Sequence, residues 1–197
     1  MPNTNDVRIG APEQKTTGAI KYAPLGTDLP DLSDIKASGV TLDSAFQGNE
    51  YVSEDGLTLT PSMSTKNIKD WSGSTVRKVL EEFDGTLQWT MISTNESAMN
   101  VAFGAEHVTT QAAAQTHGSQ MKVVLGAHLP EAQSWVFLMK DGDARIVILV
   151  PNGQVTEVGE VKFSSTEAVG WAVTLSAYPD ADGESIYIMT DDGVVSA

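Results

Sequence analysis

The sequence predicts a mainly β fold, and both composition and patterning support this. The 197-residue chain contains 19 Val and 19 Thr, two β-branched residue types that favour strands. Short runs of alternating apolar and polar residues recur between Gly, Asn and Asp turn signals, as expected for strands joined by hairpins. The length is that of one domain, which we expect to span residues 1–197.

Two runs predict strands with one buried face. Residues 83–92 alternate between an apolar face that contains Leu87 and Trp89 and a polar face that begins with Asp84. Residues 169–177 alternate between large apolar and small side chains. The small side chains suit close packing against another backbone.

Residues 134–150 predict a hairpin, because Asp141-Gly142-Asp143 can turn the chain between two apolar runs. Both runs are apolar on both faces. We therefore expect the core to cover one face and a helix or a second subunit to cover the other. Pro151-Asn152-Gly153 predicts a second turn, followed by strands at 155–163 and 184–189.

Helix is scarce. Residues 95–103 form the best candidate, with Asn95 as N-cap and Gly104 as the stop signal. A helix this short is marginal alone, so it should dock on a sheet. Residues 41–48 form a second, shorter candidate.

Three stretches, 1–16, 24–39 and 48–70, are rich in Pro, Gly, Ser, Thr and Asp and show little periodicity. We expect residues 1–16 to form an N-terminal arm and residues 48–70 to form a long loop. Compact domains contain few loops of this length unless the loops are functional, and arms that become ordered on a partner fit the composition. These segments point to assembly.

The residues that carry chemistry do not form a catalytic pattern. The chain has no Cys, which excludes thiolate nucleophiles, disulfides and Cys-ligated metals, and its three His residues lack metal-binding spacing. Gly-rich nucleotide-binding motifs and the Gly-x-Ser-x-Gly nucleophile motif are missing. Adjacent acids such as Glu81-Glu82 point to opposite faces of a strand and cannot flank one bond. We expect no enzyme, no catalytic residues, no metal and no cofactor.

The charge is strongly negative, with 26 Asp and Glu against 12 Lys and Arg and a formal net charge of −14. The cations are dispersed, and only Arg77 and Lys78 are adjacent, which disfavours nucleic-acid binding through a basic surface. The N-terminus has no apolar export signal, and no run approaches the ~18 apolar residues of a membrane span. We therefore expect a protein without a membrane segment that is made and kept in a cytoplasm.

An ordered set of strings resembles the major tail tube proteins of long-tailed, siphovirus-type phages that infect actinobacteria. The resemblance extends from about residue 16 to residue 190. The strings are GAIKYAPLGT at 18–27, DSAF at 43–46, GNEYVSEDG at 48–56, IKDWSG at 68–73, RIVI at 145–148, PN at 151–152, VTEVG at 155–159, and AVGW at 168–171 with PDADG at 179–183.

The resemblance implies a β-sandwich with one flanking helix, of which six copies form a ring around a shared inner β-barrel. The rings would stack into a tail tube, a virion structure assembled in the host cytoplasm, through which viral DNA is ejected. It also implies tape measure, tail terminator and distal tail proteins as partners. A conduit should not hold DNA, and an acidic wall repels phosphate.

Two sets of residues follow as candidates within this interpretation. We expect acids on the polar strand faces to line the bore: Glu82, Asp84, Glu157 and Glu160. We expect the N-terminal arm and the loop at 48–70 to stack rings, the loop and its flank through Tyr51, Glu54, Asp55 and Trp71. Residues 74–82 alternate poorly, and a one-residue slip would place Glu81 in the bore instead of Glu82.

Two alternatives belong to other classes of protein. A carbohydrate-binding or adhesion β-sandwich would need an export signal and exposed aromatic residues on one face. A capsid decoration or head-completion protein would use a related sandwich. Only the tube hypothesis predicts rings or self-assembling tubes.

Overall fold

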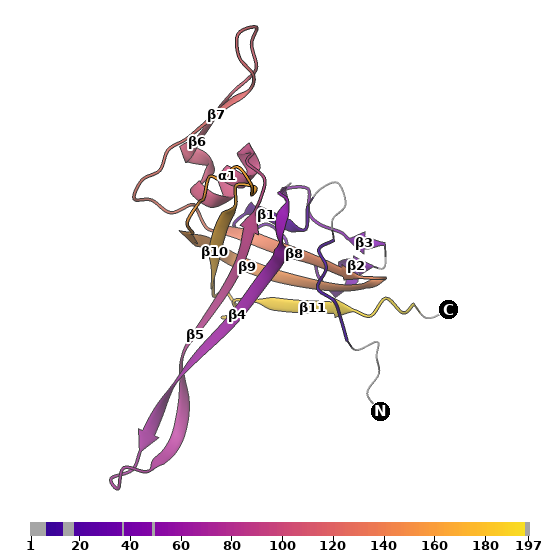
Figure 1. The fold of residues 1–197 in the computed structure, drawn as a ribbon. Helices are drawn as coiled ribbons and strands as arrows, with labels where there is room; N and C mark the ends of the chain where they lie inside the picture. The colour runs from indigo at the N-terminus through magenta and orange to yellow at the C-terminus, as the bar shows by residue number, and fades with distance from the viewer. Residues whose placement is uncertain (1–6, 14–17, 37, 49, 196–197) are drawn as a thin grey trace.

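The computed structural model describes residues 7–13, 18–36, 38–48 and 50–195, and its largest element is one antiparallel sheet (Figure 1). The strand order is β1-β8-β9-β10-β5-β4, and β11 pairs with the part of β9 that β10 leaves free. The mainly β prediction is confirmed. The strands are β1 (Ile20–Pro24), β4 (Val52–Lys69), β5 (Thr75–Met91), β8 (Gln133–Asp141), β9 (Ala144–Val158), β10 (Trp171–Tyr178) and β11 (Tyr187–Asp191).

β9 joins two layers of this sheet. Its first half pairs with β8 and β11, and its second half pairs with β10, which continues through β5 to β4. The layers face each other across the core, where the ring centroid of Trp89 lies 5.7 Å from that of Trp135 and 5.5 Å from that of Phe137. The predicted sandwich is therefore built by folding one continuous sheet.

The two strands that were predicted to have one buried face lie at the centre of the core. Leu87 of β5 is opposite Leu175 of β10, and both are fully buried. β5 begins at Thr75, however, well before the predicted start at residue 83.

The C-terminal half confirms one predicted hairpin and corrects three boundaries. β8 and β9 turn at Gly142-Asp143, where Gly142 has a φ of 61°. The expected turn at 151–153 is wrong, because β9 continues through it, and the β8–β9 register shifts just there, which is where a strand tolerates proline. β9 ends at Val158 rather than 163, and β11 begins at Tyr187 rather than 184.

The second apolar face of the β8–β9 hairpin is covered by the chain itself, not by a helix or a second subunit. Val136, Leu138, Val147 and Leu149 pack with Ile35 and with partly buried side chains from residues 29–46 and β11. Within the covering segment, β2 (Ile35–Lys36) pairs with β3 (Gly39–Val40).

The predicted second helix at 41–48 is also wrong. Asp43 instead closes a turn, in which its carboxylate accepts from the Ala45 amide (2.8 Å) and its carbonyl accepts from the Phe46 amide (3.1 Å). Such local side-chain bonds compete with helix formation.

The helix predicted at 95–103 is confirmed as α1 (Glu96–Phe103). The Asn95 side chain accepts from the Ala98 amide at 2.8 Å, and Gly104 ends the helix with a φ of 88°. Met99 and Val101 are among the side chains that α1 buries in the core. The helix thus docks on the sheet as expected.

The described part of the N-terminal arm, residues 7–13, lies along β8. Pro12 forms a bridge with Met139, and Glu13 forms a buried ion pair with Arg145 of β9 at 2.6 Å. Arg145 also donates to the Lys36 carbonyl at 2.7 Å. The remainder of the arm, residues 1–6 and 14–16, lies outside the described residues.

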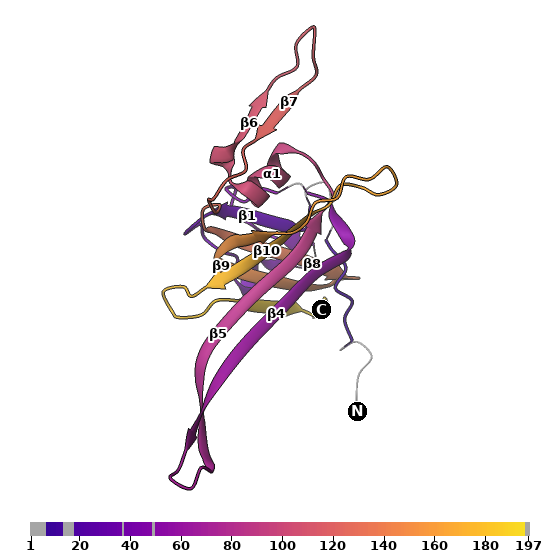
Figure 2. The ribbon, with the colours of Figure 1, turned by 60° about the vertical axis from the view of Figure 1, so that its left-hand side comes forward.

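The largest correction concerns residues 48–70, expected as a long loop. They contain β4, which has 18 residues and pairs with β5 at Val52 and again from Leu57 to Lys69, in a long hairpin that projects from the sandwich (Figure 2). A shorter hairpin of β6 (Val108–Gln111) and β7 (Gln120–Val123), which the sequence did not predict, projects from the opposite end.

Candidate functional site

One face of the β9–β10–β5–β4 layer is polar. The core-facing positions of these strands alternate with hydroxyl and amide side chains, which interact across the strands: Gln88 donates to Thr174 (3.3 Å), and Thr156 shares a hydrogen bond with Ser176 (2.9 Å). We call this surface the polar face. Its described members are Thr58, Thr60, Ser62, Ser64, Glu82, Asp84, Thr86, Gln88, Thr90, Gln154, Thr156, Glu157, Thr174 and Ser176.

Three of the four predicted bore acids belong to the polar face. Asp84 is opposite Ser62, Glu82 is opposite Ser64, and Glu157 is opposite Thr174. Glu160 follows the end of β9 and is not on a strand. The uncertain register has a structural cause, because the β4–β5 pairing shifts between Ser64 and Thr65 and leaves Glu81 as the extra residue of a bulge.

A hollow of about 300 Å³ lies at one end of the polar face. Its lining includes Asp55 and Glu157 together with Gln88, Thr90 and Thr174. It therefore brings together one predicted stacking acid and one predicted bore acid, with no Lys or Arg in the lining.

The β4–β5 hairpin is exposed on both sides beyond the sandwich, over residues 60–84. An isolated two-stranded hairpin is marginally stable in water, and a group of exposed apolar side chains marks an interaction surface. Met63 and Phe83 are opposite each other and are 66% and 40% exposed. The other large apolar side chains exposed on the hairpin are Ile68, Trp71, Val76, Val79 and Leu80.

The strand edges of this hairpin are also open. β4 is the last strand of the sheet, and β10 pairs with β5 only from Gly85 to Met91. At the other end of the sheet, β1 is partly capped, because Tyr22 and Gln47 exchange backbone hydrogen bonds of 2.8 and 2.9 Å. An open strand edge is a template for pairing with another chain.

The four predicted stacking residues lie at two ends of the hairpin. Trp71 is fully exposed in the turn between β4 and β5. Tyr51 precedes β4, where its amide donates to the Ser93 hydroxyl at 2.8 Å, and Glu54 and Asp55 are exposed near the start of β4. The structure thus brings Asp55 close to Glu157, with Glu54 beside it in sequence, but places Trp71 at the far end.

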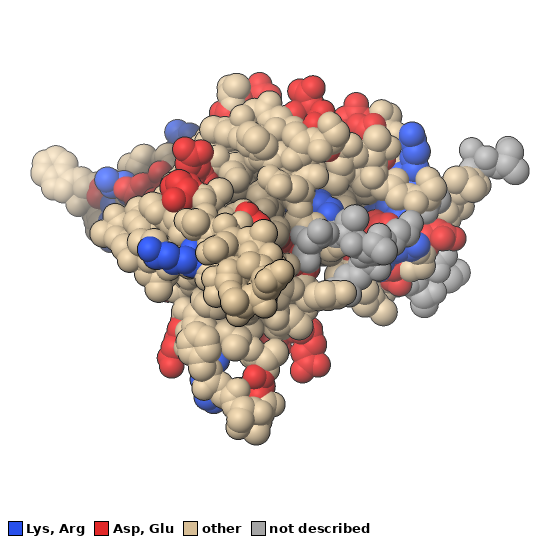
Figure 3. Space-filling view, turned by 90° about the horizontal axis from the view of Figure 1, so that it is seen from above, with Lys and Arg blue, Asp and Glu red and all other residues tan. Residues whose placement is uncertain are grey.

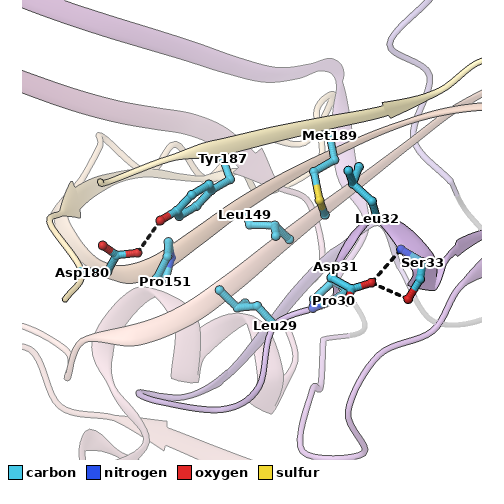
Figure 4. A pocket seen from close by; sticks show the side chains of 10 residues that line it. All are labelled: Leu29, Pro30, Asp31, Leu32, Ser33, Leu149, Pro151, Asp180, Tyr187 and Met189. Atoms are coloured by element: carbon cyan, nitrogen blue, oxygen red, sulfur yellow. Dashed lines mark hydrogen bonds between the residues drawn. The ribbon is translucent and has the colours of Figure 1, made fainter. Parts of the chain in front are cut away.

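A second surface hollow, of about 680 Å³, lies outside the polar face and is mostly apolar (Figure 4). Leu29, Leu149 and Met189 line it, and at its rim the Tyr187 hydroxyl donates to Asp180 at 2.7 Å. This bond to the carboxylate raises the pKa of Tyr187 to about 12 and lowers the pKa of Asp180. The Asp180 carboxylate also accepts from the Asp182 and Glu184 amides, and these bonds close the turn before β11.

The described residues contain no group of three or more His, Asp or Glu side chains that could hold a metal ion. No helix within these ranges is long and apolar enough to cross a membrane.

The sequence and the fold were compared with those of known proteins to identify the family of the chain. Among solved structures, the chain is similar to the anti-feeding prophage cap, a tube terminating cap solved by cryo-EM, with 12% sequence identity, a TM-score of 0.46 and coverage of 94% of this chain and 96% of that chain. A search of curated proteins found no significant match. A family profile described as phage tail tube protein matches residues 2–197. This match covers nearly the whole chain. The chain therefore belongs to the phage tail tube protein family and is a structural component of the virion tail.

Proposed function

We propose that six copies of this chain form a ring, and that the rings stack into a tail tube through which viral DNA passes during ejection. The tail tube role follows from the family, and the ring size and the passage of DNA are the added steps. In this proposal the protein is structural rather than enzymatic and assembles in the host cytoplasm.

The observation that carries the proposal is the open edge of the β4–β5 hairpin, next to a polar sheet face. Pairing of this edge with a neighbouring copy would extend the β9–β10–β5–β4 layer and could close it into a barrel, which removes free edges. The polar face would then line the bore, and the sandwich core would lie behind it.

The side chains of the polar face suit a conduit. Its members, from Thr58 to Ser64 in β4 and along β5, β9 and β10, carry hydroxyl, amide and carboxylate groups, including Asp84 and Glu157, and none of them is Lys or Arg. Carboxylates repel DNA phosphates, whereas each cation would bind them with release of counterions. DNA would therefore slide along the wall without specific binding, past Glu82, Asp84 and Glu157, with Glu160 beside the strand ends.

The projecting elements would make the contacts along the tube. The β4–β5 hairpin, with Trp71 at its turn, extends from one end of the sandwich, and Tyr51, Glu54 and Asp55 lie near the other end of β4 (Figure 1). Contacts between these ends would stack successive rings. Tape measure, terminator and distal tail proteins would be the further partners, in the bore and at the two ends of the tube.

Electron microscopy of the purified protein tests the assembly, which should give rings or tubes as wide as a phage tail. For the bore, Asp84→Lys should leave tubes intact and slow genome ejection from phage particles. Asp28→Lys, a matched change on the exposed segment that covers the opposite layer, should not slow ejection. Equal ejection rates for the two variants would contradict the bore assignment.

A further inference from the structure

Charge is distributed unevenly along the β4–β5 hairpin. Its distal part, residues 65–80, contains four of the chain's twelve Lys and Arg residues and one of its 26 acids, which gives a formal charge of +3. The remainder of the chain then carries −17. We call the four cations Lys66, Lys69, Arg77 and Lys78, together with Trp71, the basic tip.

The basic tip is built to present its side chains to a partner. The Asp70 carboxylate accepts from the Ser72 hydroxyl (2.7 Å) and the Ser74 amide (2.9 Å), and these bonds lower the pKa of Asp70 and close the turn that holds Trp71 outward. None of the four cations forms an ion pair with a described residue. Their charge is therefore available to another molecule.

The opposite end of the same hairpin is acidic. Glu54 and Asp55 lie near the start of β4, Glu157 lines the same hollow as Asp55, and Glu160 follows just past β9. We call these four residues the acidic end, and none of them is ion-paired within the described ranges. Viewed from the side opposite the basic tip, acidic groups clearly outnumber basic ones on the surface (Figure 3).

The two ends cannot neutralise each other within one molecule. β4 has 18 residues, and at about 3.3 Å per residue the ends of the strand are separated by several times the Debye length of ~10 Å at 0.1 M salt. Each end can therefore attract a partner of opposite charge, and a second copy of this chain offers one for both.

We propose that the basic tip of one copy binds the acidic end of the copy in the next ring. This inference rests on the proposed stacking of rings and adds its chemistry and direction. A contact between two different patches of identical subunits is head-to-tail, and such a contact propagates into a filament instead of closing into a dimer. The cations orient the approaching ring, and Trp71 supplies a large aromatic contact of the kind that dominates interface energetics.

Charge reversal at either end tests the contact. Lys69→Glu/Lys78→Glu should still form rings but should give at least tenfold fewer stacked tubes, counted by negative-stain microscopy. Glu54→Lys/Asp55→Lys should show the same defect. Because the two variants carry complementary reversals, an equal mixture of them should restore tubes in which the two kinds of ring alternate.

Two controls make the result decisive. Lys36→Glu/Lys140→Glu changes the net charge equally at positions on the sandwich, off both projecting hairpins, and should form tubes normally. Melting temperature should be unchanged in the tip variant, and the milder Lys69→Gln/Lys78→Gln should give an intermediate loss of tubes.

The outcomes separate this inference from the proposed function. Normal tubes from the tip variant, loss of tubes in the Lys36 and Lys140 control, or a mixture that fails to assemble would each overturn the tip-to-end contact without contradicting the proposed tube. A wild-type protein that formed neither rings nor tubes would instead overturn the proposed function.

Discussion

The two halves of β5 show how one strand serves two purposes. Inside the sandwich, Leu87, Trp89 and Met91 are at most 4% exposed. Beyond the sandwich, Val76, Leu80 and Phe83 are 40 to 62% exposed although they are equally apolar. Burial of apolar area drives both folding and association, so the inner half belongs to the core of the subunit, and we propose that the outer half belongs to an interface between subunits.

The largest expected effect is on subunit stability and comes from shortening a buried side chain in the inner half of β5. Leu87→Ala should lower the free energy of unfolding of the isolated subunit by about 2–5 kcal/mol, because it leaves a cavity in a packed core. Leu80→Ala should change that free energy by no more than about 0.5 kcal/mol, as for an exposed site, yet it should reduce tube formation. Urea unfolding of unassembled protein together with microscopy measures both quantities. A large loss of subunit stability for Leu80→Ala would show that the outer hairpin belongs to the core.

A second prediction concerns the N-terminal segment, which is anchored to the body. The Glu13–Arg145 pair is almost fully buried, so Glu13→Gln removes the charged partner of a buried guanidinium and should cost about 1–3 kcal/mol. Urea unfolding of the subunit should show this loss. Glu54→Gln, a matched change at an exposed carboxylate, should have no measurable effect on the same unfolding curve.

The contrast between buried and exposed strand positions also explains which parts of the fold could be predicted. α1 follows from local signals, Asn95 and Gly104, and the strands around Leu87 and Leu175 follow from one-sided burial. β4 could not be recognised, because a strand exposed on both faces has no hydrophobic period, and Gly56 and Pro61 within it mimic loop signals. β6 and β7 could not be recognised because each has only four residues, which is too short a run to establish a period.

The candidate site was only partly predictable. Alternation along β5 was enough to place Asp84 on the polar face, and the same parity placed Glu82 there despite the bulge at Glu81. That Asp55 and Glu157 share a hollow depends on pairing between strands distant in sequence, which periodicity does not reveal. The basic tip could not be predicted, because Lys66 and Lys69 are separated in sequence from Arg77 and Lys78, and only the hairpin turn brings the two pairs together.

A third, smaller effect is expected at the helix of the body. Asn95→Ala removes the side-chain oxygen that accepts from the Ala98 amide and should cost about 1 kcal/mol of subunit stability. Asn95→Asp should retain the cap and most of the stability. Thermal unfolding of the unassembled protein measures the difference, and equal melting temperatures for Asn95→Ala and the wild type would show that the cap contributes nothing.

The smallest effect is a titration within the body. The Asp180 carboxylate, which accepts the Tyr187 hydroxyl, raises the pKa of Tyr187 to about 12, so this phenol should ionise well above the ordinary tyrosine value of ~10. A raised pKa in the folded state stabilises the fold below pH ~10 and loses that contribution as pH rises through about 12. Absorbance titration of the wild type minus Tyr187→Phe isolates the transition, and Asp180→Asn should move it to lower pH. Because both groups lie in the body, the midpoint should be the same in free subunits and in tubes, and a midpoint that changed on assembly would extend the interface beyond the hairpin to the turn before β11.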